Sequence, residues 1–128
     1  MKLLLDTHAF IWMLEAPEKL SERVIQAHND STNTLYLSVA SLWEIQIKLA
    51  IGKLEMDVSL AQIVREQLQG HRFQLLDIRA EHVLALEELP RHHGDPFDRL
   101  LIAQARVEGL PLVSIDNVFE QYPVELFW

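Results

Sequence analysis

The residues of this sequence that could do chemistry are four carboxylates: Asp6, Glu44, Asp98 and Asp116. Asp6 directly follows the apolar run at residues 3–5, and Asp116 directly follows the run at residues 112–115. In open parallel sheets, ligands bind beyond the carboxyl ends of the strands. Turns also favour aspartate, so each residue alone is equally consistent with turn chemistry. Their common place at the ends of two strands favours the interpretation that both could hold one cation.

Glu44 has apolar residues on nearly every side in the segment from Ser41 to Lys48. A carboxylate in such surroundings is costly unless it is paired or bound to a metal ion. Lys48 stands four residues later, the spacing and order that favour an ion pair on a helix. A structural ion pair and a functional site are both open for Glu44 at this point.

Asp95 and Asp98 open the helix that is predicted from residue 95 onward. Asp95 is a natural N-cap, because Pro96 follows it at the first helical position. Asp98 in the first turn would complement the helix dipole, but such a helix also begins near the carboxyl edge of the sheet. Asp95 is therefore interpreted as a cap, whereas Asp98 fits either a dipole role or a site.

Brought together, the four carboxylates would form an anionic pocket that offers only oxygen ligands. Such a pocket suits the hard divalent cations Mg²⁺ and Mn²⁺ rather than zinc. Ions held in this way can activate water and stabilise a leaving oxygen in phosphoryl transfer. The sequence thus predicts phosphoryl-transfer chemistry, on the condition that the four residues converge in space.

Alternating strands and helices must position these residues. Strands are predicted at residues 3–5, 34–38, 73–78 and 112–115, with an edge strand at 124–127. Helices are predicted at residues 21–29, from Leu42 to a stop at Gly52, from Ser59 to near Gly70, at 81–89 and at 95–109, with a further helix start near His8. Short apolar runs without clean alternation are typical of parallel strands buried on both faces. This order predicts an α/β fold, with helices on both faces of a parallel sheet.

Length, charge and composition narrow the class of protein. The 128 residues suit a single domain over residues 1–128, and a hydrophobic content of 49% is enough for a core. Without cysteine there is no disulfide, thiolate zinc site or cysteine nucleophile. No apolar run approaches the ~20 residues of a membrane helix, so a soluble, cytoplasmic protein is expected. The net charge of −8 speaks, at face value, against nucleic acid, because binding phosphates requires lysine and arginine.

The segments around the four carboxylates resemble the PIN-domain family, and specifically VapC-type toxins of bacterial toxin–antitoxin pairs. The matching segments are LLLDTHAFIW at residues 3–12, SVASLWEIQIKLAIGKL at 38–54 and DPFDRLLIAQARVEGLPLVSID at 95–116, together with Phe119 and Tyr122. They cover nearly the whole chain in the family's order, and the first and third are specific. The resemblance implies a three-layer α/β/α sandwich around a small, mainly parallel sheet.

The resemblance also implies an activity, the cleavage of RNA with Mg²⁺ or, alternatively, Mn²⁺. Its metal-binding and catalytic acids fall on Asp6, Glu44, Asp98 and Asp116. Candidates for outer-shell contacts around the metal are Thr7, Asp95 and Asn117. The basic candidates for RNA contact are Arg91, Arg99 and Arg106, of which the last two could equally form a salt-bridged solvent face. The implied partners are an RNA substrate, a cognate antitoxin protein and a second copy of the chain in a homodimer, with no membrane.

The residue types and their spacing allow three other interpretations to be considered. His92 and His93 have no third ligand at zinc spacing, so they are interpreted as loop surface that could touch RNA. A non-catalytic α/β interaction module, with its acids serving as caps and salt bridges, is the alternative function. A phosphoacceptor receiver domain would need a second acid beside Asp6 and a lysine after a late strand, but every lysine lies at or before Lys53. With metals bound, the charge of −8 fits a selective nuclease, because divalent ions would offset the acids of the pocket.

Overall fold

A five-stranded parallel sheet organises the part of the chain that the computed structural model describes, residues 1–69 and 72–128. Its strands follow the order β3-β2-β1-β4-β5, with β1 (Lys2–Leu5), β2 (Thr34–Ser38), β3 (Gln74–Leu76), β4 (Leu112–Val113) and β5 (Leu126–Phe127). The central strand is β1, whose Leu5 is in register with Leu37 of β2 on one side and Val113 of β4 on the other. The predicted parallel sheet is confirmed.

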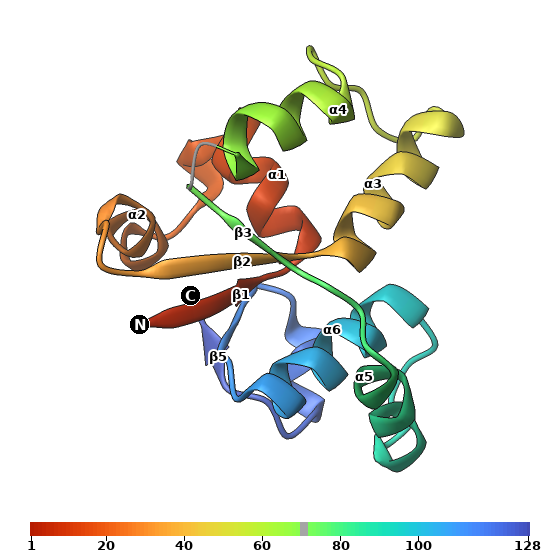
Figure 1. Ribbon diagram of the computed structural model, residues 1–128. Helices are drawn as coiled ribbons and strands as arrows, with labels where there is room; N and C mark the ends of the chain where they lie inside the picture. The colour runs from red at the N-terminus through yellow and green to blue at the C-terminus, as the bar shows by residue number, and fades with distance from the viewer. Residues whose placement is uncertain (70–71) are drawn as a thin grey trace.

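Helices cover both faces of this sheet. The α-helices are α1 (Thr7–Glu15), α2 (Glu22–Asn29), α3 (Val39–Ala50), α4 (Leu60–Ile63), α5 (Ala80–Ala85) and α6 (Pro96–Glu108). Shorter turns are the 3₁₀ helices η1 (Pro17–Lys19), η3 (Leu86–Glu88) and η4 (Asn117–Gln121) and the π-helical η2 (Val64–Leu68). Figure 1 shows α1, α3 and α4 on one side of the sheet and α5 and α6 on the other, which confirms the three-layer α/β/α arrangement.

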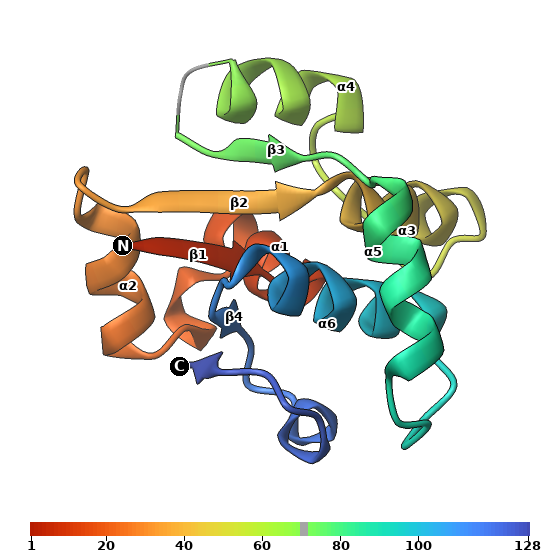
Figure 2. The same ribbon diagram turned by 60° about the horizontal axis from the view of Figure 1, so that its bottom comes forward.

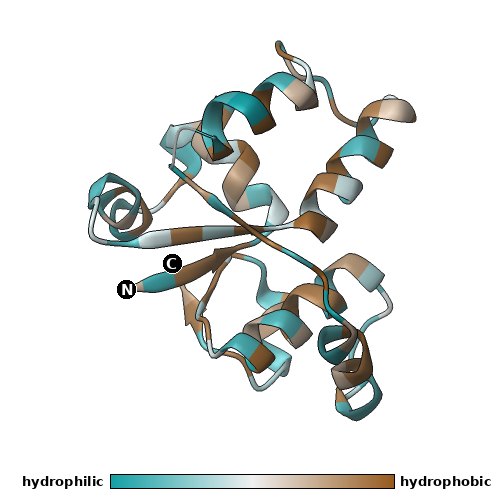
Figure 3. Cartoon of the chain, viewed as in Figure 1, coloured by the Kyte–Doolittle hydropathy of each residue, from teal (hydrophilic) through white to brown (hydrophobic). Residues whose placement is uncertain are grey.

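Each face of the sheet carries its own hydrophobic core, and β1 contributes to both. Leu3 and Leu5 pack with residues of α1 and α2, among them Phe10 and Val24. Leu4 points to the opposite face and packs with Ile102 of α6. All three leucines are completely buried, which explains why the strand sequence is apolar without alternation. Figure 3 shows this as brown strands between helices that are striped brown and teal.

The boundaries of several elements differ from the sequence-based predictions. β4 ends at Val113 rather than at residue 115, because its edge partner β5 supplies only two paired residues. The helix capped by Ser59 is only one turn of α-helix before it widens into η2, and its predicted end near Gly70 lies outside the described residues. The first helix, for which only a start near His8 is predicted, extends to Glu15. Within the described residues, no helix combines the length and apolarity needed to cross a membrane.

A candidate metal site at the carboxyl edge of the sheet

Helix starts gather at the carboxyl edge of the sheet and bring the predicted site residues with them. Asp6 follows β1 and caps α1, and its carboxylate accepts the Ala9 N–H at 2.7 Å. Glu44 lies in the second turn of α3, which begins directly after β2. Asp98 lies in the first turn of α6, and Asp116 caps η4 after β4. Figure 2 shows the arrows of β2 and β3 pointing towards the side where α3 and the start of α6 lie.

Asp6 and Asp116 form one half of the site and are linked through Ser114. The Ser114 hydroxyl oxygen accepts the Asp116 N–H at 3.0 Å, and its O–H donates to the Asp6 carboxylate. Burial raises the pKa of Asp6 above its ordinary value, against the hydrogen bonds from Ser114 and Ala9 that lower it. Repulsion from the Asp116 carboxylate raises the pKa further, so the two charges lie within each other's field. Asp6 is only 5% exposed, whereas Asp116 is open to solvent.

Glu44 is buried at 6% exposure, and three side chains orient it. The Thr7 hydroxyl donates to Glu44 Oε1 at 2.6 Å and also lies 3.0 Å from the Ser41 hydroxyl. Lys48 Nζ lies 3.0 Å from Glu44 Oε2, which is the ion pair expected from their spacing. Thr7 therefore connects the helix start after Asp6 to Glu44 on α3, and Glu44 retains one partly exposed cationic neighbour.

The ionisation of Asp98 is also disturbed by its surroundings. Burial, reinforced by repulsion from Asp95 and from Glu44, raises the pKa of Asp98 to about 6. A hydrogen bond with His93, whose Nε2 lies 3.2 Å from Asp98 Oδ2, acts in the opposite direction. The Asp98 N–H donates to Asp95 Oδ1 at 2.9 Å, so Asp95 is the N-cap of α6, as the sequence predicts.

The four carboxylates thus lie at one edge as two interacting pairs, Asp6 with Asp116 and Glu44 with Asp98. In the described residues, no three of them have ligand atoms all within 4.8 Å of one another. The donor set fits Mg²⁺ or Mn²⁺, because it consists of hard oxygens and because a cation would offset the burial and, to a smaller extent, the repulsion that raise the pKa of Asp6 and of Asp98.

A tighter cluster of Glu81, His82 and Glu108 lies elsewhere, between α5 and α6. The Arg79 guanidinium already pairs with both glutamates. His82 is fully buried; its Nδ1 accepts the Arg79 N–H at 3.0 Å, so its Nε2–H donates to Glu108 at 2.9 Å. The groups of this cluster satisfy one another, and we interpret it as an ion-pair network that joins two helices.

The three arginines that were predicted to contact RNA have different positions. Arg91 is exposed in the loop before α6. Arg99 is only 9% exposed, and its guanidinium donates to the carbonyls of Pro90 and Leu89 and to the Tyr122 hydroxyl, so it does not lie on a solvent-exposed face as expected. Arg106 lies two turns after Asp98, at the far end of α6.

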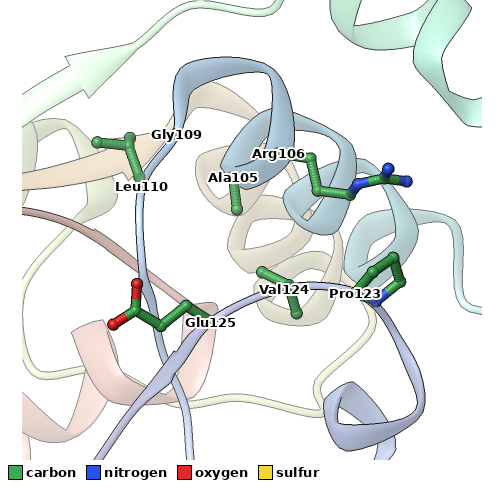
Figure 4. A pocket seen from close by; sticks show the side chains of 7 residues that line it. All are labelled: Ala105, Arg106, Gly109, Leu110, Pro123, Val124 and Glu125. Carbon is green, nitrogen blue, oxygen red and sulfur yellow. The ribbon is translucent and has the colours of Figure 1, made fainter.

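Figure 4 shows Arg106 at the rim of a cavity of about 290 Å³, where its guanidinium is directed away from Glu125. This cavity lies between the end of α6 and the segment before β5, away from the carboxylates. Among the hydrogen bonds of the described residues, none involves the side chain of Asn117, which is exposed at the start of η4.

Sequence reasoning missed other residues around the site. His93 contacts Asp98 and Tyr122, although the histidine pair was interpreted as loop surface. Trp43, 62% exposed, precedes Glu44 and meets Phe97 edge-on at 5.3 Å. A cavity of about 430 Å³ between α1 and α3 is lined by three lysines: Lys19, Lys48 and Lys53. None of these contacts has a periodic signal in the sequence, because each joins elements that are distant in the chain.

Comparisons with known proteins identify the family and the fold of the chain. The sequence profile of the PIN domain matches residues 3–125. No curated protein sequence matches the chain. Among solved structures, VapBC2 from Rickettsia felis, bound to a DNA fragment from its promoter, is similar with a TM-score of 0.71 and 19% identity, covering 99% of this chain and 98% of that one.

Two further structures show the same fold. DNA-bound VapBC from Salmonella typhimurium has a TM-score of 0.73 and 19% identity, with coverage of 99% of this chain and 97% of that one. A toxin–antitoxin complex from Klebsiella pneumoniae has a TM-score of 0.64 and 17% identity, with coverage of 98% and 96%. At these identities the likeness establishes the fold.

Proposed function

Because the chain belongs to the PIN-domain family, we propose that it is a metal-dependent endoribonuclease and the toxin of a VapBC-type toxin–antitoxin pair. The observation that carries this proposal is the gathering of four carboxylates from four separate segments at one sheet edge. Two of them, Asp6 and Asp98, have a raised pKa, which marks an anionic site that a divalent cation would stabilise.

The ion would be held by Asp6, Glu44, Asp98 and Asp116, directly or through water. When bound, Mg²⁺ or Mn²⁺ supplies an activated water and a positive charge for the scissile phosphate. The other residues of the protein orient these carboxylates. Thr7 fixes Glu44 Oε1, Ser114 fixes Asp6, and the capping hydrogen bonds fix Asp6 and Asp116 on rigid helix starts.

Three partners follow from the proposal: an RNA substrate, a cognate antitoxin protein and a second copy of this chain. The antitoxin is supported by the structural neighbours, which are VapBC and toxin–antitoxin complexes. Exposed apolar residues such as Trp43 on α3 and Ile51 directly after it offer area for a protein partner. Mg²⁺ is the proposed metal, and Mn²⁺ is the alternative.

The first test is cleavage of RNA by purified protein with and without EDTA, comparing wild type with Asp6→Asn and Asp116→Asn. Both residues are helix caps, and asparagine caps as well as aspartate, so these changes remove charge with little effect on folding. We expect each variant to lower turnover by about 100-fold or more, and EDTA to abolish it.

Asp57→Asn is the matched control, because Asp57 is an exposed aspartate in the segment after α3 and should leave turnover unchanged. An Asp98→Asn protein with full metal-dependent cleavage would refute the assignment of that ligand. If wild type neither binds Mg²⁺ nor cleaves any RNA, the non-catalytic interaction module becomes the better function. Mapping the RNA ends produced by wild type and Asp6→Ala would identify the substrate.

A further inference from the structure

His93 sits between Asp98 and Tyr122 and contacts both. Its Nδ1 lies 2.6 Å from the Tyr122 hydroxyl, and its Nε2 lies 3.2 Å from Asp98 Oδ2. The side chain is only 18% exposed, and the imidazole also meets the Tyr122 ring at 5.4 Å between centroids. The imidazole is thus held at both nitrogens, unlike that of a loop-surface histidine.

The surroundings of Tyr122 determine which nitrogen of His93 carries the proton. Three N–H groups point at the phenolic oxygen: the backbone amides of His92 and His93, each at 3.2 Å, and Arg99 Nη1 at 3.3 Å. With three donors already directed at its two lone pairs, the oxygen cannot accept a further hydrogen bond from His93, so the phenol's own hydrogen must go to His93 Nδ1. The remaining proton of a neutral His93 is then on Nε2, where it donates to Asp98.

The loop that carries His93 is fixed from the same side. Arg99 Nη1 donates to the Pro90 carbonyl at 2.9 Å, and Nη2 lies 3.4 Å from the Leu89 carbonyl. Arg99 directly follows Asp98 on α6, so the helix that presents the carboxylate also anchors the loop that contacts it. Tyr122 follows η4, is 4% exposed, and contacts both the loop and Arg99 through its hydroxyl.

We propose that His93, held in its Nε2–H form by Tyr122, is a positioning residue that orients Asp98 for metal binding. The hydrogen bond to Oδ2 fixes the orientation of the Asp98 carboxylate before a cation arrives. Outer-shell donors of this kind fix the orientation of a ligand, and their loss typically costs 10–100-fold in metal affinity. The inference rests on the proposed function and adds residues that are not themselves ligands.

The test compares two substitutions that separate the nitrogens of the imidazole. In His93→Gln the side-chain amide can place an N–H where Nε2 was, whereas in His93→Asn it reaches only the position of Nδ1. Mn²⁺ binding, measured by calorimetry on RNA-free protein, should weaken by about 10–100-fold in His93→Asn and stay within about threefold of wild type in His93→Gln. Tyr122→Phe, which removes the hydrogen that fixes the tautomer, should weaken binding by an intermediate amount.

His92→Asn is the matched control, because the His92 ring packs edge-on against Tyr122 and no hydrogen bond of its ring to Asp98 is present. Circular dichroism and thermal melting show whether each variant is folded. In addition, long-range ¹H–¹⁵N correlation spectra of wild type at pH 8 should show the imidazole proton of His93 on Nε2.

Equal Mn²⁺ affinity in His93→Asn and wild type, or a proton on Nδ1, would overturn the positioning role while the proposed nuclease stands. If His93→Asn is unfolded, Tyr122→Phe and the wild-type spectrum decide the question. Failure of wild type to bind Mn²⁺ at all would instead refute the proposed function.

Discussion

At the scale of single residues, the carboxylates of the site repel one another, and this repulsion makes the folded chain less stable. Asp98 shows this most clearly, because burial and two neighbouring carboxylates raise its pKa to about 6. The folded state therefore holds this proton more tightly than the unfolded chain, whose aspartate has a pKa near 3.8. Between these two values, stability falls as pH rises, because ionising Asp98 costs more in the folded protein.

Asp98→Asn should therefore stabilise the metal-free protein above pH 6. Two pKa units correspond to nearly 3 kcal/mol, and solvent screening of this partly exposed group reduces the expected gain to about 1 kcal/mol. Urea unfolding in EDTA at pH 4, 6 and 8 would measure it, with Asp57→Asn as the control. The gain should vanish at pH 4, and an equal gain at all three pH values would contradict the electrostatic explanation.

At the scale of elements, α6 is the part that joins the site to the rest of the fold. Besides Asp98 and Arg99, it carries Gln104, which is fully buried. Ser38, the cap of α3, donates to Gln104 Oε1 at 2.5 Å, and Gln104 Nε2 donates to the Asp77 carbonyl at 3.3 Å. One amide thus connects the starts of α3 and α5 to α6.

Gln104→Leu should lower the free energy of unfolding by about 2 kcal/mol, because it removes the acceptor of the buried Ser38 O–H and the side-chain donor to the Asp77 carbonyl. Gln46→Leu on the exposed surface of α3 is the matched control and should change stability by less than about 0.5 kcal/mol. Chemical denaturation measures both. If both variants lose a similar amount of unfolding free energy, the cause would be the exchange of glutamine for leucine in general, and not the lost hydrogen bonds of Gln104.

The elements also show what the sequence could and could not predict. The strands and the caps at Ser21, Ser59 and Asp95 follow from local residue types, and the structure confirms them. The length of β4 could not be predicted, because it depends on its edge partner rather than on its own apolar run.

In the candidate site, Asp6 and Asp116 could be predicted from their places directly after predicted strands. Glu44 and Asp98 could be predicted from the segments that resemble the PIN-domain family. The contact from His93 to Tyr122 could not, because it spans 29 residues between two loops and leaves no periodic pattern. Likewise, nothing in the spacing of Arg99 and Arg106 indicates that the guanidinium of the first is directed inward.

At the scale of the whole molecule, positive charge is scarce and concentrated. The sequence has four lysines against a net charge of −8, and three of them line the cavity between α1 and α3. Lys48 pairs with Glu44, so this cavity borders the carboxylate site. Lys19 Nζ lies 5.6 Å from the centre of the Trp12 ring, and Lys53 lies in the segment after α3.

If RNA enters along this cavity, Lys19→Gln combined with Lys53→Gln should weaken RNA binding and its dependence on salt. Loss of two phosphate contacts to a single strand lowers the slope of log K against log salt by about 1.4. Fluorescence anisotropy with a short single-stranded RNA in EDTA, which prevents cleavage, would measure this.

Lys2→Gln is the matched control, because Lys2 begins β1 at the amino edge of the sheet, away from the carboxylates. An unchanged slope in the double variant would exclude this path. Arg91→Gln and Arg106→Gln, measured in the same way, would then show whether either of these two exposed arginines contacts the RNA phosphates instead.

For the nuclease proposed above, the central place of β1 also determines when activity could arise. β1 needs β2 and β4 as neighbours, and β4 is made more than a hundred residues after it. Pairings of such high contact order form late, after the intervening helices. A growing chain on the ribosome therefore has Asp6 long before Asp116, and its sheet stays open until β4 arrives. We expect incomplete translation products to be harmless to the cell, with activity arising only when synthesis has passed β4.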